Sequence, residues 1–193
     1  MRTFENPENV LQDEREITEY CDVLRSEEVS LYLEVGSKFG GSLWRAARVM
    51  PKGSRIVAID LPNGTKAWAQ SKASLVDCVN ELCNLGYDAR IIWGDSTSPE
   101  VVRRAALAGP YHAIMIDGDH RTPGLTNDWE NYGPMSRGMV AFHDISWRRA
   151  PGWVGTRIDV PEFWDELKKN HRHKEIRHCP TGKNNGIGVL WKD

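Results

Sequence analysis

The sequence predicts one α/β domain built on a doubly wound, mostly parallel, Rossmann-like sheet of seven strands with helices on both faces. Three observations lead to this fold class. Short apolar runs alternate along the chain with segments of helical spacing. The first run, residues 31–36, stops at a glycine, as a buried parallel strand often does. The chain has 193 residues, 40% of them hydrophobic and 27% charged, which is enough for one domain with a full core. Right-handed crossovers then make the sheet parallel.

The predicted helices have apolar periodicity or clear end signals. Over 9–28, Val10 and Ile17 belong to a set of apolar residues near helical spacing. Later helices are expected over 42–50, 66–85, 99–108, 126–132 and 161–170. Ser98 is a suitable N-cap for the helix at 99–108, which begins with a proline, and Gly86 ends the helix before it. We expect residues 1–29 to form a helical segment that packs on a domain of residues 30–193.

The predicted strands are short apolar runs that end at polar or turn residues. After 31–36 they are expected over 55–60, 89–95, 111–119, 138–144 and 186–192. Polar residues gather at the ends of these runs: Glu34, Asp60, Asp95, Asp117, Asp119, His143 and Asp144. Ligands of such sheets bind outside the carboxyl ends of the strands. These residues therefore mark the expected functional site.

The composition argues against a nucleic-acid-binding, membrane-spanning or secreted protein. The formal net charge is -2, so no global basic field favours nucleic acid. No apolar run approaches the roughly 18 residues of a membrane span, and the polar N-terminus has no signal-peptide core. Four cysteines lack the CxxC spacing of a zinc site, which fits reduced thiols in a cytoplasmic protein: Cys21, Cys78, Cys83 and Cys179. We expect a small-molecule acceptor as partner, with neither nucleic acid nor membrane, and leave a homo-oligomer open.

A glycine loop joins the first predicted strand to the next helix, with the pattern E-x-G-x-x-x-G-G-S over residues 34–42. Gly36 suits a sharp turn, and Gly40 leaves room for a ligand near the main chain. The loop lacks the lysine of a phosphate-binding P-loop and the second glycine of a dinucleotide fingerprint. Glu34 would repel a pyrophosphate but suits the ammonium group of an amino-acid moiety.

The next two strand ends carry candidates for binding a nucleoside. Asp60 is placed to accept hydrogen bonds from a ribose diol, and Asp95 with Ser96 can contact an adenine. Enzymes that use NAD also carry an acid at the position of Asp60. This residue alone therefore does not separate the two kinds of cofactor.

These segments resemble the class I S-adenosylmethionine-dependent methyltransferases. LEVGSKFGGS matches their first motif and IVAID their second, and the resemblance covers residues 30–192. The stretch IDGDHRTPGLTNDWENYGPMSRGMVAFHDI, with PEFWDELK and GIGVLW, is similar to the branch that includes cephalosporin-hydroxylase-like proteins and macrolide and aminocoumarin sugar O-methyltransferases. The expected cofactor-binding residues are Glu34, Gly36, Ser37, Gly40, Ser42, Asp60, Asp95, Ser96 and Asp117. The resemblance implies methylation of a hydroxyl on a sugar or small natural product.

A cluster of acids and histidines follows the fourth and fifth predicted strands. Carboxylates with an imidazole can hold a divalent ion, which would make a substrate hydroxyl more acidic. By resemblance to catechol-type and sugar-type enzymes, Asp117, His143 and Asp144 would be the metal ligands. His143 stands where these enzymes have Asp or Glu, and imidazole suits manganese, iron or zinc better than magnesium. His143 can instead hydrogen-bond the substrate or accept its proton.

Asp117 and His120 are the expected catalytic residues. His120 lies at the offset where a related catechol-type enzyme has its lysine base, and imidazole titrates near neutral pH. A structural histidine at a strand end is the alternative. Beside Gly118, Asp119 is typical of a turn. Asp128 is expected either behind the site or on the surface.

Three functions remain open from the sequence. The first is the metal-assisted or metal-free O-methyltransferase, the second an S-adenosylmethionine-binding protein without turnover, and the third a nucleotide-dependent oxidoreductase on a related sheet. The pair His143-Asp144 also occurs in all-helical metal phosphohydrolases, but its strand context argues against them. The segment from Trp147 to Val160 is a candidate lid because its tryptophans and arginines suit sugars or anionic groups. A disordered surface loop is the alternative.

Overall fold

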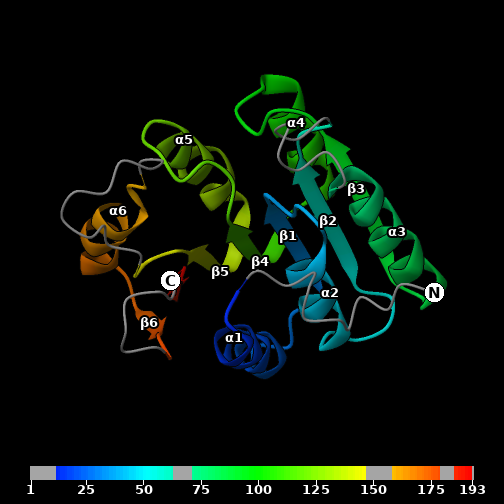
Figure 1. Ribbon diagram of the computed structural model, residues 1–193, viewed down its shortest axis with the longest axis horizontal. Helices are drawn as coiled ribbons and strands as arrows, with labels where there is room; N and C mark the ends of the chain where they lie inside the picture. The colour runs from blue at the N-terminus through cyan, green and yellow to red at the C-terminus, as the bar shows by residue number, and fades with distance from the viewer. Residues whose placement is uncertain (1–11, 63–70, 147–157, 179–184, 193) are drawn as a thin grey trace.

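A single seven-stranded sheet organises the protein, as the computed structural model shows for residues 12–62, 71–146, 158–178 and 185–192 (Figure 1). The strands are β1 (Leu31–Val35), β2 (Arg55–Asp60), β3 (Asp88–Trp93), β4 (Tyr111–Ile116), β5 (Ser136–His143), β6 (His173–Ile176) and β7 (Ile187–Trp191). They lie in the order β3-β2-β1-β4-β5-β7-β6. The pairs among β1 to β5 are parallel, and β7 is antiparallel to both β5 and β6. The predicted fold class is confirmed.

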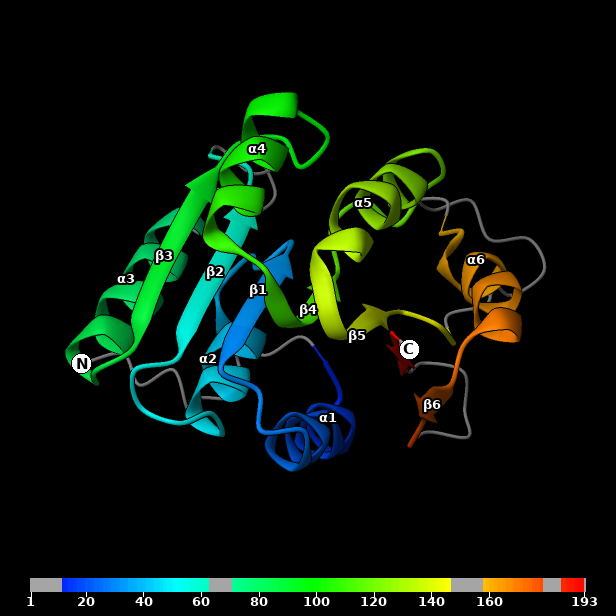
Figure 2. The same ribbon diagram turned by 180° about the vertical axis from the view of Figure 1, so that it is seen from behind.

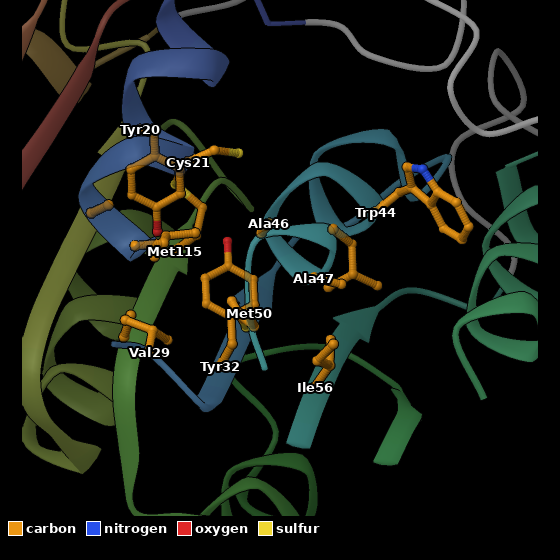
Figure 3. Close-up of a cluster of buried hydrophobic side chains, with 14 of the residues drawn as sticks. Tyr20, Cys21, Val29, Tyr32, Trp44, Ala46, Ala47, Met50, Ile56 and Met115 are labelled. Carbon is orange, nitrogen blue, oxygen red and sulfur yellow. The ribbon is translucent and has the colours of Figure 1, made fainter. Parts of the chain in front are cut away.

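Helices cover both faces of the sheet (Figure 2). On one face lie α1 (Glu14–Ser26), α2 (Gly41–Arg48) and α3 (Ser71–Asn84); on the other lie α4 (Pro99–Ala108), α5 (Gly124–Tyr132) and α6 (Val160–Leu167). Each face has its own buried apolar layer. Figure 3 shows part of the first layer, where Tyr20 of α1 and Tyr32 of β1 lie side by side and Ala47 of α2 lies on the other side of Tyr32. No helix in the described parts of the chain is long and apolar enough to cross a membrane.

Strand β1 shows how the two layers arise from the sequence. Successive side chains of a strand point to opposite faces. Tyr32 therefore belongs to the layer of α1 to α3, whereas Leu33 and Val35 belong to the layer of α4 to α6. Both sets are buried because a parallel sheet is covered on both sides. Glu34 shares the face of Tyr32, and this alternation decides its position in the site.

The register of the strands brings their ends together. Val35 pairs with Ile59 of β2 and with Ile116 of β4, and Ile116 pairs with Phe142 of β5. The residues that follow these positions therefore lie at the same level, at or just beyond the strand ends: Gly36, Asp60, Asp117 and His143. Polar groups from four strands thus meet at one edge, as expected for a ligand site in such a sheet.

Two elements differ from the expectation in ways that matter for the site. The sequence pattern locates six strands, and the seventh is β6, which runs along β7 at the sheet edge. The N-terminal helix begins at Glu14 rather than at residue 9, with Asp13 as its N-cap, and residues 1–11 lie outside the described parts. Figure 1 shows α1 near the start of β1, and it packs against α2, β6 and β7.

Candidate active site

A cavity of about 810 Å³ lies at the carboxyl ends of the strands. This volume suits a small molecule or cofactor. Most of the residues expected in the site line it: Gly36, Ser37, Ser42, Asp60, Asp95, Ser96, Asp117, His120, His143 and Asp144. Glu34 and Gly40 are not among the described lining residues. The structure therefore brings the glycine loop and the cluster of acids and histidines to a single cavity.

Two glycines of the loop lie so close to neighbouring atoms that a side chain would not fit. Gly36 has φ +88°, and a Cβ atom there would lie 2.2 Å from the carbonyl oxygen of Asp117. The ends of β1 and β4 can approach this closely only because residue 36 has no side chain. Gly40, at φ +84°, is the N-cap of α2, and a Cβ there would lie 2.8 Å from Cβ of Cys78. Packing on α3 thus gives one reason for a glycine at position 40, and the expected approach to a ligand stays a prediction.

Asp60 faces the cavity and also holds the glycine loop. One carboxylate oxygen accepts a hydrogen bond from the backbone N–H of Lys38, and the other accepts one from Leu61 at 2.7 Å. Burial raises the pKa of Asp60, although these backbone donors and the Lys38 charge oppose the shift. Lys38 has φ +49°, a left-handed conformation rare for a residue other than glycine. The predicted contact with a ribose diol stays a prediction.

Glu34 lies beneath the loop rather than in the cavity. Its side chain is fully buried; Oε2 accepts a hydrogen bond from Tyr32 at 3.0 Å, and Oε1 accepts one from Ser42 at 2.9 Å. Burial raises the pKa of Glu34 to about 7, against the effect of the Ser42 hydrogen bond. The expected contact with a ligand ammonium does not fit this position. Glu34 instead ties β1 to the first turn of α2, and Asp117 is the carboxylate that faces the cavity nearby.

Four side chains from two strand ends form an acid–imidazole cluster, which comprises Asp117, His120, His143 and Asp144. Oδ1 of Asp117 lies 3.0 Å from Nε2 of His120 and 3.1 Å from Nδ1 of His143. Nδ1 of His120 lies 3.0 Å from Oδ2 of Asp144. His120 thus bridges the carboxylate after β4 and the carboxylate after β5. Asp144 has φ +66°, a strained conformation of the kind that occurs at functional sites.

The sequence profile of a family described as a methyltransferase domain matches residues 33–145, more than half of the chain. The chain belongs to this methyltransferase family. The matched segment contains the glycine loop and the whole acid–imidazole cluster. The family expected from the motifs is thereby confirmed, whereas the sugar O-methyltransferase branch remains a prediction.

Solved structures share the fold of this methyltransferase. A Staphylococcus aureus protein described as a caffeoyl-CoA O-methyltransferase has a TM-score of 0.74 at 16% identity, over 100% of this chain and 93% of that chain. The O-methyltransferase TomG from Streptomyces achromogenes scores 0.69 at 16% identity, over 98% and 85%. An O-methyltransferase from Bacillus cereus scores 0.65 at 16% identity, over 96% and 85%. No curated protein sequence matches the chain significantly.

The charges of the cluster in this methyltransferase depend on one another. Burial would raise the pKa of Asp117, but the His143 and His120 imidazoles outweigh burial and hold that pKa well below its usual range. Burial would lower the pKa of His120, but hydrogen bonds to Asp117 and Asp144 raise it to about 10. The pKa of His143 is likewise raised against burial, chiefly by Asp117. Near neutral pH the His120 imidazole is therefore a cation, held between the carboxyl groups of Asp117 and Asp144.

The expected metal ligands Asp117, His143 and Asp144 converge, but their donor atoms face one another. In the described ranges, no group of three or more His, Cys, Asp or Glu side chains is arranged to hold an ion. An imidazole must also lose its proton before it can bind a metal. Nε2 of His143 and Oδ1 of Asp144 are buried without a hydrogen-bond partner among the described residues. The cluster in this arrangement does not fit a divalent ion, and we derive no step through one.

The structure adds lining residues that sequence patterns did not indicate. Gln12, just before α1, donates a hydrogen bond from Nε2 to Oδ2 of Asp117 at 3.0 Å. Asn127 and Asn185 also line the cavity. Gln12 and Asp117 are 105 positions apart, so no local motif links them. Only the packing of α1 near the sheet edge brings Gln12 to the site.

Asp119 and Asp128 are two acids near the cluster whose surroundings point to structural roles. Oδ1 of Asp119 accepts a hydrogen bond from the N–H of Arg121 at 3.1 Å, as expected of a turn residue. Asp128 is fully buried, and neither of its carboxylate oxygens has a hydrogen-bond partner within bonding distance in the described structure. Burial raises the pKa of Asp128 to about 6. Asp128 thus lies behind the site rather than on the surface.

Most of the expected lid, residues 147–157, lies outside the described residues.

Proposed function

We propose that the protein is an S-adenosylmethionine-dependent O-methyltransferase whose acceptor is a hydroxyl of a sugar or small natural product. The observation that carries this proposal is the single cavity joining the glycine loop to the acid–imidazole cluster in a chain of the methyltransferase family. We place the donor beside the glycine loop and the acceptor beside the acid–imidazole cluster within this cavity of about 810 Å³. The TomG structure contains S-adenosylmethionine and the Bacillus cereus structure contains S-adenosylhomocysteine.

The proposed cofactor contacts follow the strand ends. The donor's methionyl part lies along the loop at Gly36 and Ser37, and its ammonium group binds Asp117. Asp60 binds the ribose, while Asp95 and Ser96 border the adenine. This arrangement keeps the contacts expected from the sequence, except that Asp117 replaces Glu34 at the ammonium group.

The transfer itself is an in-line displacement, so the protein mainly positions the two reactants. The acceptor oxygen forms a bond to the methyl carbon as the bond from carbon to sulfur breaks, and the hydroxyl proton passes to the cluster. In the free protein both nitrogens of His120 contact carboxylates, so His120 must first lose a proton to solvent and release one of these contacts before it can take the hydroxyl proton. The positive sulfonium favours this change, because a nearby like charge lowers the pKa of an imidazolium.

Calorimetry tests the first half of this proposal. We expect S-adenosylmethionine and S-adenosylhomocysteine to bind and NAD to give no heat, because the Asp117 carboxylate disfavours a pyrophosphate at the loop. Transfer of labelled methyl to hydroxylated acceptors then tests turnover. Failure to bind S-adenosylmethionine at millimolar concentration overturns the proposal. Binding without transfer to any acceptor favours the protein without turnover, and binding of NAD favours the oxidoreductase.

Metal assistance is a separate part of the proposal, with Asp117, His143 and Asp144 as the ligands expected from the sequence. Because the cluster does not fit an ion as it stands, we expect methyl transfer to persist in excess EDTA. Adding Mg²⁺ or Mn²⁺ should then change the rate little. A loss of transfer in EDTA that Mn²⁺ restores would show that the cluster opens around a metal. A cytoplasmic location and a homo-oligomer remain predictions from the sequence.

A further inference from the structure

Glu16 is a buried acid that neither the cofactor contacts nor the transfer step uses. It lies on the buried side of α1, and its side chain is fully buried. Oε1 accepts a hydrogen bond from the backbone N–H of His178 at 3.2 Å, and Oε2 accepts one from the N–H of Gly186 at 3.1 Å. One carboxylate thus holds the backbone at two positions near the C-terminus. A buried polar group is costly unless hydrogen-bond partners such as these compensate it.

The segment held by Glu16 is itself paired with the end of β5. The N–H of Ser146 donates to the carbonyl of Asn185 at 2.8 Å, and the N–H of Ile145 donates to the carbonyl of Gly186 at 3.4 Å. The two segments also lie close together at this point, as the position of Gly186 shows. A Cβ on Gly186 would lie 2.5 Å from Oγ of Ser146. The position of residues 185–186 therefore determines the path of the chain directly after Asp144.

Asp144 needs such support. It has φ +66°, which a residue other than glycine adopts only where surrounding structure imposes it. Its side chain is buried, and Oδ2 lies 3.0 Å from Nδ1 of His120. A change in the backbone after Asp144 would rotate this carboxylate away from His120. The contacts from α1 to the cluster thus form a continuous path through backbone hydrogen bonds.

We propose that Glu16 is a positioning residue of the active site, acting through Gly186 and the backbone after Asp144 to hold Asp144 against His120. The catalytic part of this inference rests on the proposed function, whereas the structural path does not. A carboxylate is needed because both of its oxygens accept N–H groups. A glutamine at this position would present an NH₂ group to one of the two donors.

Glu19 offers a matched control on the same helix. It binds the side chains of Lys174, at 2.8 Å, and of His178. Glu19 therefore also joins α1 to the C-terminal part of the chain, but by partly exposed side chains and without contact to Gly186. Loss of Glu19 should weaken the attachment of α1 without moving the backbone beside Asp144.

The test compares Glu16→Gln with Glu19→Gln by two readouts. The first is the ¹⁵N–¹H NMR signal of the His120 imidazole, assigned by its loss in His120→Gln; we expect it to shift in Glu16→Gln and to stay unchanged in Glu19→Gln. The second is kinetics: Glu16→Gln should lower kcat about 10- to 100-fold, as for a misplaced catalytic group, with unchanged affinity for S-adenosylmethionine. Glu16→Asp, which keeps the charge but is one methylene shorter, gives the same readouts should Glu16→Gln fail to fold.

The outcomes separate this inference from the proposed function. An unchanged His120 signal in a folded Glu16 variant overturns the positioning role, as does an equal loss of kcat and Tm in Glu16→Gln and Glu19→Gln. If the wild-type protein transfers no methyl group at all, the proposed function fails. The NMR comparison still decides in that case whether Glu16 holds Asp144 against His120.

Discussion

Gly36→Ala is expected to destabilise the protein by about 2–5 kcal/mol and to abolish binding of S-adenosylmethionine. The left-handed conformation costs an alanine about 1–2 kcal/mol, and overpacking adds about 1–3 kcal/mol. The upper end is expected here because the added Cβ would lie 2.2 Å from the backbone carbonyl oxygen of Asp117, which is no flexible side-chain end. Relief of the clash must separate β1 from β4, and this opens the loop that borders the cavity. Urea unfolding and calorimetry measure the two effects.

Gly53→Ala is the matched control for this prediction. Gly53 has a similar φ of +82°, but among the described residues no heavy atom other than those of its chain neighbours lies within 4 Å of the position that its Cβ would take. This variant should therefore lose only the conformational cost of about 1–2 kcal/mol and keep its affinity for S-adenosylmethionine. If Gly36→Ala costs no more than Gly53→Ala, the close approach of β1 and β4 is not what makes glycine necessary.

Six strand positions along the chain could be predicted because the inner parallel strands are continuous apolar runs that are buried on both faces. Strand β6 was not predicted because it lacks such an apolar run. Its sequence, His173-Lys174-Glu175-Ile176, is short and mostly charged, and it lies at the edge of the sheet. Edge strands are often short and charged because this discourages pairing with other chains. Such a strand is recognised only once β7 provides its partner.

The position of a candidate site residue could be predicted where it depends on a strand end, but not where it depends on the face of a strand or on distant packing. Asp60, Asp117 and His143 follow directly from the register of the strands. Glu34 was misplaced because a strand buried on both faces shows no polar alternation that reveals which side a residue takes. Gln12 reaches Asp117 only through the docking of α1, which no local pattern encodes.

His120→Gln is expected to lower kcat by about 10²–10⁴-fold, the range typical of a lost general base, while the affinity for S-adenosylmethionine changes little. Glutamine can neither carry the proton nor bridge two carboxylates as a cation.

The pKa of about 10 for His120 also predicts the pH profile. The base must be neutral to act, so kcat/KM of the wild-type protein should rise with pH up to about 10. This rise should be absent in His120→Gln. Initial rates across pH test both expectations.

His112→Gln is the control, because His112 lies near the other end of β4 and accepts a hydrogen bond from the backbone of Ser30, far from the cavity. It should leave kcat and the pH profile unchanged. An unchanged kcat in His120→Gln would contradict the role of His120 as the base. His120 would then have the structural role at a strand end that the sequence also allows. Asp144→Asn then separates the remaining cases. If it lowers kcat while His120→Gln does not, the hydroxyl proton passes to the carboxylate, and His120 only holds that carboxylate in its strained position.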